Sequence, residues 1–141
     1  MQLADYLDDV AGRPCAYGRL DCATLMADWL MALGWGDAMA DRRGTYATER
    51  AYRAAIRSEG GMVASCRRRF ARLGLAAAAA PGGGDVALVL APFLLREGRP
   101  SLCRPTGAIM GEGGFVFVLD WPRGVVGVRL PVIAAWSAAR A

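Results

Sequence analysis

Apolar residues recur every three or four positions through the first half of the chain, which is the spacing of amphipathic helices. This pattern predicts helices near residues 2–10, 22–33, 48–58 and 63–73. Glycine and proline lie between these segments, and both disfavour a continuous helix. In the last helix the positions expected to face inward are Val63, Cys66, Phe70 and Leu73.

The second half changes to short apolar runs bounded by turn residues, a pattern typical of β-strands. It predicts strands at 85–90, 106–110, 115–119 and 125–130. The run 115–119 is apolar at every position, so we expect a buried strand inside the sheet. Residues 92–105 are expected to form a long loop. Pro131 ends the fourth strand, and the apolar residues Ile133 and Trp136 predict a short final helix.

Helices followed by antiparallel strands define an α+β fold, with N-terminal helices packed on a C-terminal β-meander. The alanine- and glycine-rich stretch 76–84 is expected to be a flexible connector between a helical part, 1–75, and a β-rich part, 85–141. Each part alone is small for independent stability, so we expect a single domain over 1–141. The side chains expected to share its core include Trp29, Leu88, Phe115 and Phe117.

The segment around Asp21 and Cys22 is the strongest candidate for chemistry. Asp21 precedes a helical pattern and is a good N-cap, so Cys22 falls in the first turn of the helix. The positive end of the helix dipole favours the thiolate form of such a cysteine. Cys22 also lies on the same face as Leu25 and Met26, where a cysteine behaves as a small buried hydrophobe. Both interpretations, a nucleophile and a core cysteine, stay open.

The chain contains no histidine, and this absence restricts the chemistry available to it. Cysteine proteases, zinc hydrolases and serine-triad enzymes ordinarily need an imidazole as a base or a ligand. The cysteines are Cys15, Cys22, Cys66 and Cys103. They form no Cys-x-x-Cys pair, so we expect neither a metal site nor a bound cofactor.

The net charge is +4, and every basic residue is arginine. A local positive patch is formed by Arg67, Arg68, Arg69 and Arg72. The aromatic residue within this run, Phe70, is expected to face inward and not to stack on bases, so we expect a solvated helix face and no nucleic-acid partner. No apolar run is long enough to span a bilayer. Residues 1–9 are acidic and lack a basic lead-in, so we expect no signal peptide and synthesis in the cytoplasm of the cell that makes the chain.

Several short motifs occur in an order that resembles the NlpC-type cell-wall cysteine peptidases, which have a papain-like fold. The motifs are Tyr17 to Cys22, Arg43-Gly44-Thr45-Tyr46, Gly60-Gly61, Gly84-Asp85-Val86, Gly107 to Gly111 and Ala135-Trp136. Together they cover nearly the whole chain. The pattern is most similar to small phage and prophage members of this superfamily that are encoded among tail genes.

The resemblance assigns roles to individual residues. Cys22 matches the nucleophile, Tyr17 the tyrosine on the substrate side, and Asp21 the helix cap beside them. The histidine base of the family would stand just before Gly107, where this chain has Pro105 and Thr106. Neither side chain accepts a proton from a thiol near neutral pH, and the following strand offers no polar residue to orient a base. The resemblance therefore implies a retained scaffold from which the catalysis has been lost.

Three functions are compatible with this sequence. The first is a structural component of the tail tip or baseplate of a phage or phage-like particle, whose partners are other tail proteins. The second is an active peptidoglycan-cleaving peptidase or amidase in which Cys22 works with Asp21 or with a residue of a partner chain. The third is a binding module that holds a peptide or glycan without cutting it. In the first, residues 92–105 would cover the Cys22 cleft or a neighbouring subunit.

Overall fold

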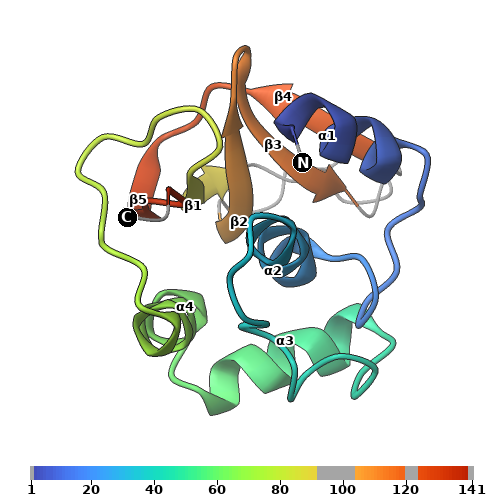
Figure 1. Ribbon diagram of the computed structural model, residues 1–141. Coiled ribbons are helices and arrows are strands. Elements are labelled where there is room, and N and C mark those ends of the chain that lie inside the picture. The colour runs from blue at the N-terminus through green and yellow to red at the C-terminus, as the bar shows by residue number, and fades with distance from the viewer. Residues whose placement is uncertain (1, 92–103, 120–123, 140–141) are drawn as a thin grey trace.

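The computed structural model describes residues 2–91, 104–119 and 124–139, with the backbone alone over 116–119 and 124–128. Its helices are α1 (Leu3–Ala11), α2 (Cys22–Ala32), α3 (Glu49–Ser58) and α4 (Met62–Leu73). Its strands are β1 (Val86–Ala91), β2 (Arg104–Gly111), β3 (Gly114–Leu119), β4 (Gly124–Val128) and β5 (Val132–Trp136). The helices come first in the chain and the strands second (Figure 1), so the α+β prediction is confirmed.

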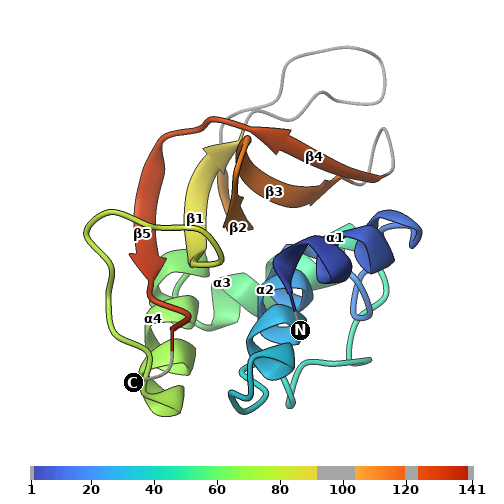
Figure 2. The same ribbon diagram turned by 45° about the horizontal axis from the view of Figure 1, so that its top comes forward.

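The described strands form one antiparallel sheet in the order β4-β3-β2-β1-β5. β2 and β3 are joined by a tight hairpin in which Gly111 pairs with Gly114. β3 has a partner on each side, so it is an interior strand as predicted. Figure 2 shows the sheet above and the helices below, so the helices cover one of its faces.

The prediction of a short final helix is wrong, because residues 132–136 form strand β5. β5 pairs with β1, with Val86 opposite Trp136 and Ala87 opposite Ala135. Ile133 and Trp136 are three residues apart, which fits a helix locally. The open edge of β1 offers this segment a row of backbone hydrogen bonds, and its β-branched residues favour a strand. Long-range pairing therefore overrides the local spacing.

The main core lies between the helices and the sheet. α2 is its centre, because Leu25, Met26 and Leu30 have no exposed surface. Trp29 is 3% exposed, packs beside Tyr6, and donates its indole N–H to the carbonyl of Gly84 at 2.7 Å. The same core includes the ring pair formed by Phe70 of α4 and Trp136 of β5. It also includes two aliphatic residues of the sheet, Leu88 and Ile109.

The other face of the sheet carries a smaller cluster, and Phe115 belongs to it. Its neighbours there include Ala87, Val89 and Ala108. Side chains alternate between the two faces of a strand, so Phe115 and Leu88 point to opposite sides. The prediction that Phe115 shares a core with Trp29 and Leu88 is therefore wrong. The side chain of Phe117 and the loop residues 92–103 lie outside the described residues.

The prediction that Arg69 lies on a solvated helix face is wrong, because this residue is only 6% exposed. Its guanidinium donates to both carboxylate oxygens of Asp41, at 2.6 and 3.0 Å, and to Glu59 at 3.0 Å. Buried Arg42 pairs with the same Glu59. The two arginines thereby join α4 to the loop before α3, whereas Arg67, Arg68 and Arg72 are exposed.

We expect Trp29→Ala to lower the free energy of unfolding by about 3–5 kcal/mol, because it leaves a cavity in the main core and an unpaired Gly84 carbonyl. Urea denaturation measures the change. Met31→Ala is the matched control, since Met31 lies on the same helix and is 45% exposed. We expect the control to change stability by less than about 0.5 kcal/mol. Equal effects of the two substitutions would contradict the placement of Trp29.

We expect the free energy of unfolding to fall in acid, because the carboxylates of Asp41 and Glu59 that accept hydrogen bonds from Arg69 become protonated. Hydrogen bonds from Arg69 lower the pKa of Asp41. Burial acts to raise the pKa of Glu59, but hydrogen bonds from Arg69 and Arg42 outweigh it and leave that pKa below its ordinary value. A carboxyl group whose pKa is lower in the folded state than in the unfolded state stabilises the fold fully above its unfolded pKa of about 4. This stabilisation is lost as the pH falls through the folded-state pKa.

Arg69→Met should therefore flatten the decline in unfolding free energy between about pH 5 and pH 2. Urea titrations at several pH values measure the slope. Arg67→Met removes an exposed arginine two positions earlier on α4 and should keep the full slope. An unchanged slope in Arg69→Met would show that the acid response arises elsewhere.

Candidate functional site

Cys22 is the first residue of α2, and Asp21 caps the helix in front of it. One carboxylate oxygen of Asp21, Oδ1, accepts hydrogen bonds from the backbone N–H groups of Ala23 at 3.0 Å and Thr24 at 2.9 Å. The N–H of Asp21 in turn donates to Thr24 Oγ1 at 2.8 Å. This reciprocal capping box explains why the Asp-Cys-Ala-Thr sequence begins a helix at Cys22.

The second oxygen of Asp21, Oδ2, is bound as fully as the first. It accepts from the backbone N–H of Gly18 at 2.9 Å and from the hydroxyl of Tyr46 at 3.0 Å. Asp21 is 1% exposed, so these bonds replace water almost completely. Every oxygen of the carboxylate is thus engaged by donors, and the group serves as a structural anchor for the start of α2.

The two motifs Tyr17–Cys22 and Arg43–Tyr46 contact each other directly. Gly44 donates its N–H to the carbonyl of Gly18 at 3.1 Å. Gly18 has a φ of 87°, and a Cβ atom there would lie 2.2 Å from the carbonyl oxygen of Tyr46. Only glycine tolerates both this conformation and this approach. Motifs more than twenty positions apart in the sequence therefore form one side of the site.

Three tyrosines line this side. The ring of Tyr52 lies 5.3 Å from the rings of both Tyr17 and Tyr46, measured between centroids. Burial, followed by the nearby Cys22 and Asp21, raises the pKa of Tyr52 well above its ordinary value. In the sequence, Tyr52 and Ile56 stand four positions apart, a spacing that predicts only the apolar side of a helix. Its helical spacing gave no signal that it lies beside Cys22.

Strand β2 closes the site from the sheet side. A Cβ atom on Gly107 would lie 2.5 Å from the carbonyl oxygen of Cys22 and 2.6 Å from Met26 Cε. Gly107 pairs with Leu88, whose side chain belongs to the main core. At this position the sheet approaches the beginning of α2 so closely that only a residue without a side chain fits there.

The alternation of β2 separates the two residues expected at the base position. Pro105 lies two positions before Gly107, on the face toward α2, whereas Thr106 lies on the opposite face. Thr106 is 3% exposed and donates its hydroxyl to the carbonyl of Arg104 at 3.1 Å. The row of β2 that faces Cys22 thus presents a proline and a glycine, and neither residue has a side chain that accepts a proton.

The remaining described cysteines differ in exposure. Cys22 and Cys15 are half-buried, so Cys22 is not the fully enclosed core residue that its spacing allowed. Cys66 has no exposed surface, and burial raises the pKa of its thiol to about 12, which keeps it protonated. Cys103 lies outside the described residues. Within the described ranges, no group of three or more His, Cys, Asp or Glu side chains is placed to hold a metal ion.

The sequence matches a family described as Domain of unknown function (DUF6950) over residues 1–138. Because this match covers almost the entire chain, the chain belongs to that family. No curated protein sequence and no solved structure matches it. Over the parts of the chain that the structure describes, no helix is long and apolar enough to cross a membrane.

We expect Gly107→Ala to destabilise the fold by at least about 1–3 kcal/mol, because its methyl group would overlap the backbone of Cys22. Gly113→Ala is the matched control, since a Cβ atom there meets nothing within 4 Å. Thermal unfolding of both variants measures the difference. Equal melting temperatures would mean that β2 and the start of α2 are not in close contact.

Proposed function

We propose that this chain is a structural component of the tail tip or baseplate of a phage or phage-like particle, built on a degenerate NlpC-type, papain-like cysteine-peptidase fold. The observation that carries the proposal is the close packing of Cys22, at the start of α2, against strand β2. Cys22 stands at the first position of α2, and its backbone carbonyl lies against Gly107 of β2, an arrangement that fits the resemblance. On the face of β2 toward α2, Gly107 and Pro105 supply no base.

The alternative of an active peptidase needs another proton acceptor near Cys22. Asp21 is adjacent in sequence, but its carboxylate already receives N–H or O–H donors on both oxygens. Protonating it would break part of the cap that holds Cys22 in place. A general base typically contributes a factor of 10² to 10⁴ in rate, so its loss favours a non-catalytic role.

A domain that no longer cuts can keep its cleft as a contact surface. The partners that follow from this proposal are neighbouring tail proteins. The chain would be made in the bacterial cytoplasm and then incorporated into the particle. The third function considered from the sequence, a peptide- or glycan-binding module, differs by predicting retention of peptidoglycan without cleavage and without incorporation into a particle.

The test uses particles purified from a producing strain that carries wild-type protein, Cys22→Ser or Cys15→Ser. We expect mass spectrometry to find the chain in all three particle preparations. We expect the three to release peptidoglycan fragments at the same rate, because Cys22 performs no chemistry. Cys15→Ser is the matched control, since it removes another half-buried thiol.

Two results would overturn the proposal in different ways. Absence of the chain from purified particles would reject the structural role in a tail. Loss of fragment release in Cys22→Ser alone, with Cys15→Ser unaffected, would establish Cys22 as a nucleophile and the chain as an active hydrolase.

A further inference from the structure

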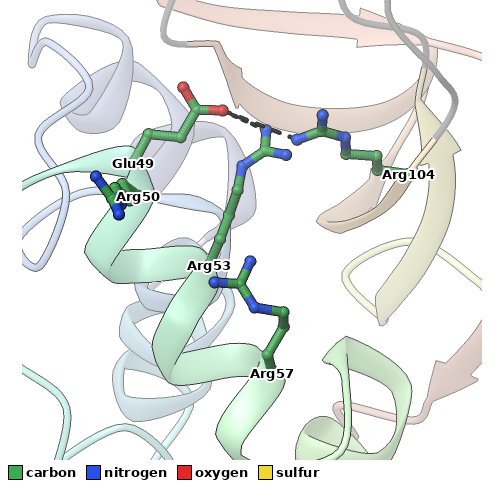
Figure 3. Close-up of a pocket in the computed structure, with 5 residues that line it drawn as sticks. All are labelled: Glu49, Arg50, Arg53, Arg57 and Arg104. Carbon is green, nitrogen blue, oxygen red and sulfur yellow. Dashed lines mark hydrogen bonds and ion pairs between the residues drawn. The ribbon is translucent and has the colours of Figure 1, made fainter.

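A second feature of the surface lies between α3 and the start of β2. It is a pocket of about 310 Å³ lined by Glu49, Arg50, Arg53, Arg57 and Arg104 (Figure 3). Three of its arginines come from α3, and Arg104 reaches it from the sheet. We propose that this pocket binds a phosphate or diphosphate group of a small ligand.

The charge of the pocket is strongly unbalanced. Four guanidinium groups line it against a single carboxylate, that of Glu49. Arg53 pairs with Glu49 Oε1, and Arg104 Nη1 lies 3.9 Å from the same oxygen atom. Two guanidinium groups thus share one carboxylate oxygen. Their positive charges repel each other at this short range. A multiply charged anion would relieve that repulsion.

Arg104 carries the second observation. Its Nη1 atom is enclosed by protein, yet it meets no hydrogen-bond acceptor in the described part of the chain. A separation of 3.9 Å from Glu49 is too long for a hydrogen bond. Enclosed polar groups are ordinarily paired, because leaving one without a partner costs free energy. An oxyanion seated in the pocket would supply the missing acceptor once the Arg104 side chain turns Nη1 toward it.

The arrangement suits a phosphate better than a flat carboxylate. In Figure 3 the guanidinium of Arg53 extends from the helix and that of Arg104 from the strand toward the same region. Donors on two separate elements therefore approach from different directions. Guanidinium groups bind phosphate oxygens through charge-assisted hydrogen bonds, often two at a time. A tetrahedral group with two or more negative charges matches both the directions and the excess of positive charge.

The pocket differs from a nucleic-acid surface in its composition. None of its lining residues is aromatic, so it offers no ring on which a base could stack. The pocket is also separate from the proposed tail function, since it uses none of the residues around Cys22. The proposal of a phosphate site there does not depend on whether the chain is part of a particle.

The experiment is isothermal titration calorimetry of the full chain with inorganic pyrophosphate, ADP and succinate at low ionic strength. The variant pair Arg50→Gln and Arg57→Gln, combined in one protein, tests the helix side, because both side chains are exposed and their loss leaves the core intact. Arg104→Gln tests the strand side. The matched control combines Arg67→Gln and Arg72→Gln, exposed residues of α4 outside the pocket.

We expect pyrophosphate to bind, and its Kd to rise at least about tenfold in Arg104→Gln and in the α3 double variant. The control should keep the wild-type Kd, and circular dichroism should show all variants folded. Tighter binding of ADP than of pyrophosphate would identify a nucleotide as the source of the diphosphate. Equal affinities would identify the diphosphate alone.

Three results would overturn the proposal. One is the absence of binding heat with both pyrophosphate and ADP. The second is an equal loss of affinity in the α4 control, which would reveal only the general positive charge of the surface. The third is binding of succinate as tight as that of pyrophosphate, which would reject phosphate chemistry for this pocket.

Discussion

The buried carboxylate of Asp21 is the interaction on which the architecture around Cys22 depends. Its two oxygens collect donors from the preceding turn, from the first turn of α2 and from Tyr46. These groups come from residues 18–24 and from Tyr46, so one side chain fixes the start of α2 against the turn before it and the loop before α3. Removing it would leave buried donors without acceptors, each costing about 1–3 kcal/mol. The negative charge also opposes the positive end of the helix dipole.

The helices could be predicted from the sequence because their signals are local. Asp21 with Thr24 forms a capping box, and Thr48 caps α3 by accepting from Ala51. The errors arose where distant residues decide the outcome. β5 is a strand because β1 lies beside it, about forty-five positions earlier in the chain. Arg69 is buried because Asp41 and Glu59, on other segments, surround its guanidinium.

In the candidate site, too, the local features could be predicted from the sequence and the long-range contacts could not. The position of Cys22 at the start of a helix follows from its neighbours in sequence. The place of Tyr52 beside it does not, because that contact depends on how α3 packs against α2. The choice between Pro105 and Thr106 needed the register of β2, since a shift of one residue reverses which side chain faces the helix. The pocket at Arg104 likewise exists only once β2 meets α3.

The strand order has a consequence for how this chain is synthesised. β1 pairs on one side with β2 and on the other with β5, which follows it about forty-five positions later in the chain. Until residues 132–136 emerge, the apolar strand β1 has an open edge with unpaired backbone groups. Such edges recruit strands from other molecules, so the nascent chain passes through an interval in which it is prone to aggregate. Synthesis of residues 132–136 therefore acts as the protective step of folding, and a chain truncated before residue 132 would leave this edge of β1 unpaired.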